Sequence, residues 1–150
     1  MNRRQLTALG GLLLPFVGVC GGAYAANSGT CDLFFSGGVS IKAIPVAATV
    51  EQRSRGLAGR EYAGNGMLFS WGNSEPRAFS MRGVRFPLSV GFLSEDGTLF
   101  AIERMEANTD KFYLSMLPAS DAIELAVGQF EKVGLVVGFK LIRRECKVSG

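Results

Sequence analysis

Short runs of apolar residues, separated by Gly, Pro, Asn or Asp, dominate the chain after residue 30. Strands are predicted over 33–35, 39–46, 67–71, 77–81, 88–93, 99–105, 122–127 and 139–145. The first two form a hairpin, with Val39, Ile41 and Ala43 on one face of its second strand. Strands that recur about every ten residues are typical of a sandwich or barrel rather than of alternating strands and helices.

Helical signals are few. Thr49 and Gln52 have the spacing of a capping box and predict a helix over 50–57, which Gly56 and Gly59 end. Residues 129–133 favour a single helical turn, whereas 106–120 follow no period and are expected to be irregular. The sequence therefore predicts a mostly β (α+β) fold, a compact antiparallel sandwich or barrel-like domain with one or two short helices.

The first 25 residues have the pattern of a secretory signal peptide. Two arginines precede an apolar run over 6–19, and Ala23-Tyr24-Ala25 has the small-x-small form of a cleavage site. The run is shorter than the roughly 20 residues that span a bilayer. We expect cleavage after Ala25, a single domain over 26–150 without a stable membrane anchor, and a periplasmic or secreted location.

Two alternatives concern this segment. Lipid attachment at Cys20 is less favoured, because a bulky valine stands where such sites carry Gly, Ala or Ser. The Arg3-Arg4 pair is compatible with either the general or the twin-arginine export route, and the choice between them stays open.

Removal of the segment changes the charge and cysteine counts. Two of the 16 basic residues and none of the 13 acidic ones precede Ala26, so the mature chain carries 14 basic and 13 acidic residues, a net charge of +1. No basic block alternates with aromatic residues, and nucleic-acid binding is not expected. Cys31 and Cys146 remain, and an even pair in an oxidising compartment predicts a disulfide, with two unrelated buried thiols as the alternative.

The side-chain inventory excludes much familiar chemistry. The chain has no histidine, so Ser-His-Asp and Cys-His arrangements, two-histidine zinc motifs and an imidazole base are all excluded. Met67 and Met81 are expected to be core residues rather than a Cu(I) site. Asp96 and Asp110 lack the ligand spacing of a calcium loop. We therefore expect no metal and no other cofactor.

Glu124 is the most isolated charge in the chain, within the apolar stretch 122–127. Strand alternation sets it on the face opposite the large apolar residues. One interpretation is a partly desolvated carboxyl with a raised pKa, or one that pairs with Arg55, Arg60 or Arg82 in a cleft. The alternative is a glutamate on a solvated face, or one that anchors a loop by accepting backbone amides.

The three arginines occupy two predicted elements. Arg55 and Arg60 lie at and just beyond the helix end, where a helix C-terminus stabilises cations. Arg82 follows the strand predicted over 77–81. Three guanidiniums that face one cleft would form a planar, bidentate receptor for a carboxylate or phosphate. Residues 111–113, Lys-Phe-Tyr, are either a lid over a ligand or an anchor for the irregular segment.

Several fragments occur in an order that resembles a known family. They are Arg55-Gly56-Leu57, Arg60, Gly66-Met67-Leu68-Phe69, Phe79-x-Met81, Pro87-Leu88 and Ile123-Glu124-Leu125 before Gly128. Over about residues 39–142 the chain is similar to the family called domain of unknown function 192. The resemblance implies a compact, mostly β fold, frequent export and no settled biochemical activity.

The chain also departs from the family pattern. Members typically read Phe-Trp-Met-Lys-Asn-Thr where this chain has Phe79-Ser80-Met81-Arg82-Gly83-Val84, and Pro-Leu-Asp where it has Pro87-Leu88-Ser89. The cation is kept, but the Asn-Thr pair and the aspartate are lost. An activity of relatives that depends on that aspartate is not expected here.

These observations favour a periplasmic ligand-binding or accessory module. Its polar cleft would hold a small anionic ligand, with Glu124 ordering one arginine; the candidate residues are Arg55, Arg60, Met81, Arg82 and Glu124. The alternative is a carboxylate-dependent, hydrolase-like enzyme that uses Glu124, which would need a second carboxyl at roughly 6 to 9 Å. Because the sequence offers no such partner, a non-enzymatic role is favoured and enzymatic activity stays undecided. The ligand, the biological process and the oligomeric state are not predicted.

Overall fold

The computed structural model describes residues 29–148. The predicted signal peptide and Cys20 lie outside the described residues and stay predictions. Within the described part of the chain, no helix combines the length and the apolar character that crossing a membrane requires.

Seven strands form the main sheet, in the order β6-β5-β8-β3-β2-β1-β9. Their bounds are β1 Thr30–Phe35, β2 Ser40–Ala47, β3 Met67–Glu75, β5 Leu88–Leu93, β6 Leu99–Met105, β8 Ala119–Ala126 and β9 Leu141–Lys147. A small second sheet pairs β4, Ala78–Ser80, with β7, Phe112–Leu114. The two short α-helices are α1, Val50–Arg55, and α2, Gln129–Val133, and a 3-10 turn, η1, covers Ser36–Gly38. The predicted mostly β fold with one or two short helices is confirmed.

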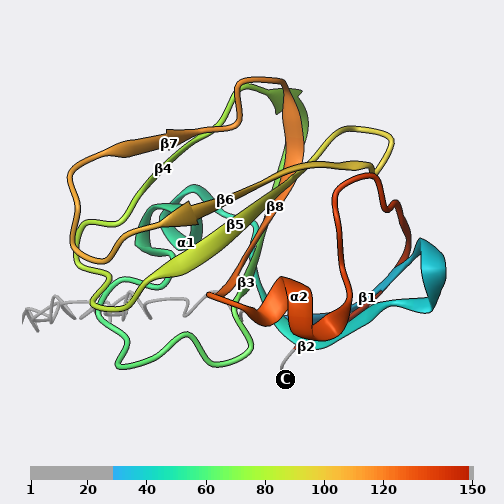
Figure 1. Cartoon of the computed structure of the whole chain (residues 1–150), viewed down its shortest axis with the longest axis horizontal. Helices are drawn as coiled ribbons and strands as arrows, with labels where there is room; N and C mark the ends of the chain where they lie inside the picture. Colours follow the sequence, from blue (N-terminus) through green and yellow to red (C-terminus); the bar gives the residue numbers. More distant parts are fainter. Residues whose placement is uncertain (1–28, 149–150) are drawn as a thin grey trace, which may run out of the picture.

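The main sheet curls until its two edge strands approach each other (Figure 1). Thr98, before β6, bridges Lys140, before β9. The Leu99 amide donates to the Phe139 carbonyl at 2.8 Å, and the Gly138 amide donates to the Leu99 carbonyl at 2.8 Å. The sheet is therefore a half-barrel that is closed at one end, as the predicted barrel-like domain requires.

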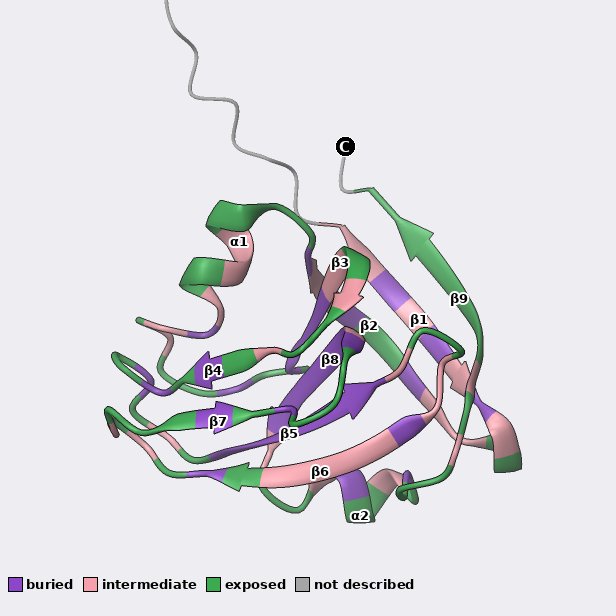
Figure 2. Cartoon of the chain, turned by 90° about the horizontal axis from the view of Figure 1, so that it is seen from above, coloured by how far each residue is buried: buried purple, intermediate pink, exposed green. Residues whose placement is uncertain are grey.

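One strand pair differs from the prediction of an antiparallel sheet. β2 and β3 are parallel, with Val46 opposite Leu68 and Ala47 opposite Phe69. The chain between them forms α1 and a loop, a crossover of the kind that a parallel pair requires, and β3 begins beside the last residues of β2. This crossover brings α1 to the same side of the molecule as β4 and β7 (Figure 2).

The predicted hairpin of β1 and β2 is present, but its alternation is interrupted by a bulge. Cys31 lies opposite Ile44 and Leu33 opposite Ile41, so one extra residue is accommodated in β2. Ala43 takes φ +50° and is exposed, while Ile44 is fully buried. The prediction that Ala43 shares a face with Ile41 is therefore wrong. The Asp32 carboxylate accepts a hydrogen bond from the Ala43 amide at 2.8 Å and holds the bulge.

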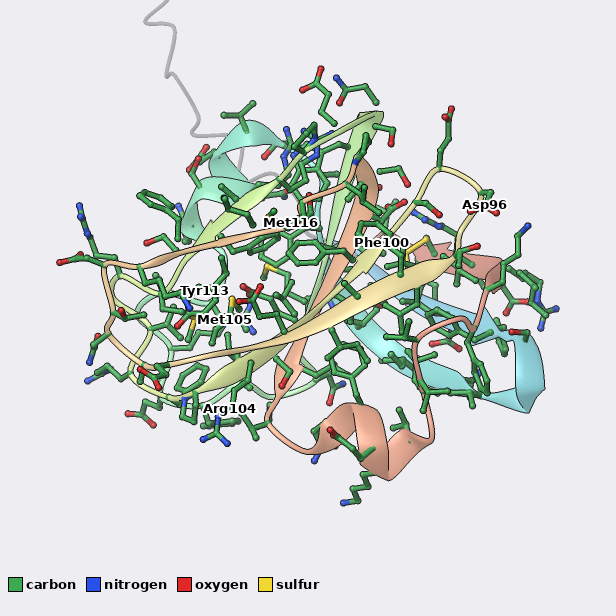
Figure 3. All side chains as sticks on the ribbon, turned by 45° about the horizontal axis from the view of Figure 1, so that its top comes forward. Asp96, Phe100, Arg104, Met105, Tyr113 and Met116 are labelled. Atoms are coloured by element: carbon green, nitrogen blue, oxygen red, sulfur yellow. A yellow bond between two sulfur atoms is a disulfide. The ribbon has the colours of Figure 1, made fainter. Side chains whose placement is uncertain are left out.

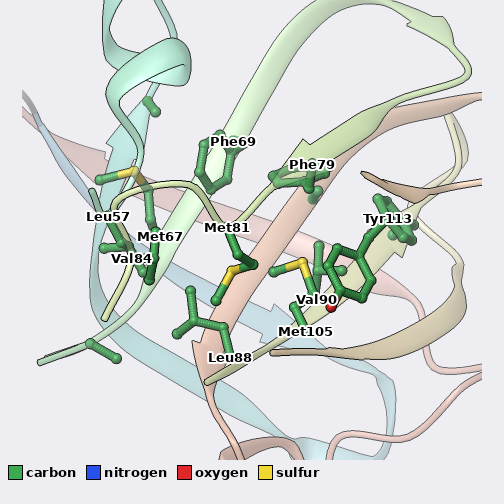
Figure 4. Packing of buried hydrophobic residues seen from close by; sticks show 14 of the residues in the cluster. Leu57, Met67, Phe69, Phe79, Met81, Val84, Leu88, Val90, Met105 and Tyr113 are labelled. Atoms are coloured by element: carbon green, nitrogen blue, oxygen red, sulfur yellow. The ribbon is translucent and has the colours of Figure 1, made fainter. Parts of the chain in front are cut away.

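The segment expected to be irregular, 106–120, contains β7 and the start of β8. Tyr113 is buried, and its ring lies beside Met105 (Figures 3 and 4). Its hydroxyl accepts a hydrogen bond from the Glu106 amide at 2.9 Å. Tyr113 therefore anchors a segment whose short strand has too few residues to show a period.

The disulfide between Cys31 and Cys146 is confirmed. The two residues are directly opposed in the antiparallel β1–β9 pair, with Cα atoms 4.0 Å apart. The bond joins the first and last strands of the described domain. A structural disulfide of this kind is typical of proteins outside the cytoplasm.

Two apolar clusters cover the two faces of the sheet. Ile123 and Leu125 of β8 belong to the cluster that Phe130 of α2 completes. Ala122 belongs to the other cluster, which faces α1 and β4. The predicted alternation along β8 is thus confirmed, and it sets Glu124 on the side of α1.

Candidate functional site

A pocket of about 680 Å³ opens between α1, β3, β4 and β8. Its lining residues include Arg53 and Arg55 from α1, Phe69 and Trp71 from β3, and Glu124 from β8. Phe79, Arg82 and Phe112 complete the side toward the small sheet. The volume lies within the range of about 300 to 1,000 Å³ that is usual for sites of small organic ligands.

The position of α1 is fixed by its own sequence. The Thr49 hydroxyl accepts from the Gln52 amide at 3.2 Å, and the Gln52 side chain accepts from the Thr49 amide at 3.1 Å. The predicted capping box is confirmed, although the helix ends at Arg55. Arg53 donates to the Ala48 carbonyl and, at 3.0 Å, to the Ser70 carbonyl of β3. These bonds tether the helix to the sheet above the pocket.

Glu124 forms the floor of the pocket. Its side chain is only 4% exposed, with Met67 and Val90 as its cross-strand neighbours. Burial raises the pKa of its carboxyl to about 8, so it is mostly protonated at neutral pH. Among residues 29–148 its carboxyl has no ion-pair or hydrogen-bond partner, and since no fully buried side-chain nitrogen or oxygen there lacks one, its oxygens reach the pocket. The solvated-face interpretation is therefore wrong, and the desolvated one is supported.

Aromatic side chains form one wall. The Phe69 and Phe79 rings meet edge to face at 5.0 Å, and Trp71 lies 6.2 Å from Phe79. Arg53 and Arg77 lie over the Trp71 ring at 5.5 and 4.3 Å from its centroid. These cation–π contacts hold the indole in place at the pocket edge.

The rim carries the exposed charges. Arg55 pairs with Glu51 at 3.0 Å, with side chains 70% and 80% exposed, and Arg82 pairs with Asp110 at 3.1 Å. The expected pairing of Glu124 with one of these arginines is therefore not formed. Each rim arginine thus has its own acidic partner, and neither forms an ion pair with Glu124 at the floor.

The five residues predicted for the site do not all meet. Arg55, Arg82 and Glu124 line the pocket, whereas Arg60 and Met81 are not among its lining residues. Met81 is fully buried in the cluster beneath, as Figure 4 shows. Its apolar side chain makes it part of the core that supports the site.

Sequence reasoning missed Arg53 and Trp71 as lining residues. Trp71 and Phe69 alternate on β3, a signal that would have set them on one face. The sequence predicts that residues 111–113 are either a lid over a ligand or an anchor for their segment. Phe112 lines the pocket, as a lid residue would, whereas Tyr113 is the buried anchor.

The acid inventory bears on the enzymatic alternative. Glu124 is the only acidic residue among those that line the pocket. Ser89, at the family's aspartate position, lies opposite Leu125, so alternation along β5 sets it on the other face of the sheet from Val90 and Glu124. Within 29–148, no group of three or more acidic or cysteine residues has the geometry to hold a metal ion. The pocket thus lacks a second carboxyl for paired acid and base chemistry.

Comparisons with known proteins agree with this architecture. A candidate transcription regulator from Sinorhizobium meliloti 1021 has a similar crystal structure, with a TM-score of 0.65 and 25% identity over 79% of this chain and 93% of that one. A protein of unknown function from Novosphingobium aromaticivorans DSM 12444 has a TM-score of 0.66 and 20% identity, over 77% and 83% of the two chains. No match to the curated proteins was found. Residues 35–142 match the model of a family described as an uncharacterized ACR, and the chain belongs to this family, DUF192.

Proposed function

We propose that this domain works outside the cytoplasm, in the periplasm or as a secreted protein, as a binding or accessory module for a small organic anion held in the pocket beside α1. The observation that carries the proposal is Glu124, a buried carboxyl without a partner that opens onto a cavity of about 680 Å³. The disulfide and the predicted signal peptide support the location.

In the described part of the chain no fully buried side-chain nitrogen or oxygen lacks a hydrogen-bond partner, so the Glu124 carboxyl, which has no such partner, reaches the pocket with its oxygens. The apolar residues around it still disfavour its ionised form. A desolvated carboxyl that opens onto a pocket and makes no contact within the chain is a candidate for contact with a ligand. A pocket wall of Phe69, Trp71 and Phe79 supplies the apolar surface that such a ligand would bury.

Charge supports the preference for an anion. Three guanidiniums, of Arg53, Arg55 and Arg82, belong to the lining, against the single carboxyl of Glu124. Burial keeps that carboxyl mostly protonated at neutral pH, and Glu51 and Asp110 balance Arg55 and Arg82, so the charge of Arg53 is left as a positive excess around the pocket. A guanidinium can also bind a carboxylate or phosphate through two parallel hydrogen bonds.

Trp71 provides a direct readout, because it is the only tryptophan in the sequence and it lines the pocket. We would titrate the purified protein with small carboxylates, phosphates and neutral sugars, following Trp71 fluorescence and the thermal midpoint. Anions are expected to change both signals. Arg82→Ala should abolish the response and barely change the unliganded midpoint, because an exposed ion pair contributes only about 0 to 1 kcal/mol.

Arg104→Ala is the matched control, since Arg104 is exposed on β6 and does not line the pocket. It should respond to anions as the unmodified protein does. Absence of any response to the whole series would contradict the proposed function. Equal losses in the two variants would show that binding depends on overall charge rather than on the pocket.

A further inference from the structure

The charged groups that face the pocket form two separate sets. At the rim, Arg55 and Arg82 are exposed and paired with Glu51 and Asp110. At the floor, Glu124 is surrounded by its apolar neighbours Met67, Phe69 and Val90. A ligand that extends from rim to floor therefore meets cations at one end and a lone carboxyl at the other.

Residues 29–148 supply no ion-pair partner for that carboxyl. Among the lining residues the positive charges are those of Arg53, Arg55 and Arg82. Arg53 donates to two backbone carbonyls and lies over Trp71, and the other two have acidic partners. A desolvated carboxyl either stays neutral or, when it ionises, pairs with a cation. A ligand that brings a cation to the pocket floor would therefore find in Glu124 an acidic group with no competing ion-pair partner.

Aromatic rings next to the carboxyl favour an organic cation. Phe69 follows Met67, the cross-strand partner of Glu124, by two residues and shares its face of β3. Phe79 lies 5.0 Å from Phe69 and also lines the pocket. The π face of an aromatic ring attracts an ammonium group, most strongly where water is excluded.

We propose that the ligand carries a protonated amine as well as an acidic group, with the amine paired to Glu124 at the floor and the acidic group bound at the arginine rim. The ligand class is thus a zwitterion such as an amino acid or one of its derivatives. This inference rests on the proposed function, because the rim contact is the one proposed above.

The pairing predicts a proton release. At pH 7 the empty pocket holds Glu124 mostly protonated, since burial raises its pKa to about 8. An ammonium partner favours the ionised form and lowers that pKa, so close to one proton leaves Glu124 when the ligand binds. The other charged groups that line the pocket are Arg53, Arg55 and Arg82.

Two matched ligand series test the inference by isothermal titration calorimetry. One is phenylalanine with phenylpropanoate and phenethylamine, and the other is ε-aminohexanoate with hexanoate and pentylamine. Within each series the members differ by the amine or by the carboxylate alone. In at least one series the zwitterion should bind about tenfold more tightly than the acid that lacks the amine. Titrations in two buffers of different ionisation enthalpy should show proton release for the ligands that carry the amine and none for the acids.

Variants separate this inference from the proposed function. Glu124→Gln should remove the preference for the zwitterion over the acid, whereas Arg82→Ala should weaken the binding of both and keep that preference. The proton count on the unmodified protein needs no variant and decides the matter if Glu124→Gln does not fold. Equal affinity of acid and zwitterion without proton release would overturn the inference and leave the proposed function standing. Absence of binding by every acid and zwitterion would overturn both.

Discussion

The α-carbon of Gly66 lies against the main-chain carbonyl of Glu124, so close that a Cβ on Gly66 would be 2.1 Å from that oxygen. Gly66 also takes φ +76°, a conformation that glycine adopts without a steric penalty. It immediately precedes β3, whose first residue, Met67, is the cross-strand partner of Glu124. The position of the pocket floor therefore depends on the absence of a side chain at residue 66.

Gly66→Ala is expected to destabilise the protein by about 3 kcal/mol or more, because the new methyl group forces β3 and β8 apart. Gly128→Ala is the matched control. Gly128 has φ +85° but open space around its missing Cβ, so only conformational strain of about 1 to 2 kcal/mol applies. Urea unfolding of the two variants measures the difference. Equal losses would show that the contact with Glu124 relaxes without cost.

Loss of the Cys31–Cys146 bond should lower the free energy of unfolding by roughly 4 to 5 kcal/mol, since the bond closes a loop of 115 residues in the unfolded chain. The measurement is urea unfolding of the Cys31→Ser/Cys146→Ser double variant. A reductant should destabilise the unmodified protein by a similar amount and leave the double variant unchanged. A double variant as stable as the oxidised protein would contradict this expectation.

Most of the strands were predictable because buried strands leave apolar runs between turn residues, and the capping box of Thr49 and Gln52 marks the start of a helix. The parallel pairing of β2 and β3 was not, because register and strand direction depend on contacts between distant segments. The bulge at Ala43 was also hidden, since its cause is the Asp32 side chain on the neighbouring strand.

The candidate site was predictable in part, because the pattern along one strand is visible in the sequence. Alternation along β8 was enough to single out Glu124, because an acidic residue in an apolar strand is informative by itself. The arginine partners were not predictable. Arg82 bonds Asp110, 28 residues away, and Arg53 reaches Ser70 across the α1–β3 connection, so both contacts depend on the folded chain path. The exclusion of Met81 from the pocket likewise depends on which side of β4 faces the core.

Ala43→Gly is expected to stabilise the protein by about 0.5 to 1 kcal/mol. Ala43 takes φ +50°, which glycine adopts more readily than alanine, and its exposed methyl group contributes little packing. The Asp32 bond uses the main-chain amide and is kept in the variant. Thermal and urea unfolding measure the gain. A loss of stability would indicate that the greater flexibility of glycine in the unfolded chain outweighs the relief of strain.

The stability of the protein should fall with rising pH through a contribution of Glu124. Burial raises the pKa of this carboxyl from an ordinary value of 4.5 to about 8 in the folded protein, so between these values the folded state holds a proton that the unfolded state has lost. The contribution is fully present below about pH 4.5 and is lost as pH rises toward 8, at roughly 1 kcal/mol per pH unit. The test uses Glu124→Gln, which removes the titrating group and keeps the shape of the side chain. Urea unfolding of both proteins between about pH 5 and 8 should therefore show that the unmodified protein loses stability as pH rises, relative to the variant. A difference that is constant over this range would mean that Glu124 is ionised in the folded protein, and that the floor of the pocket is not dry enough to hold a neutral carboxyl.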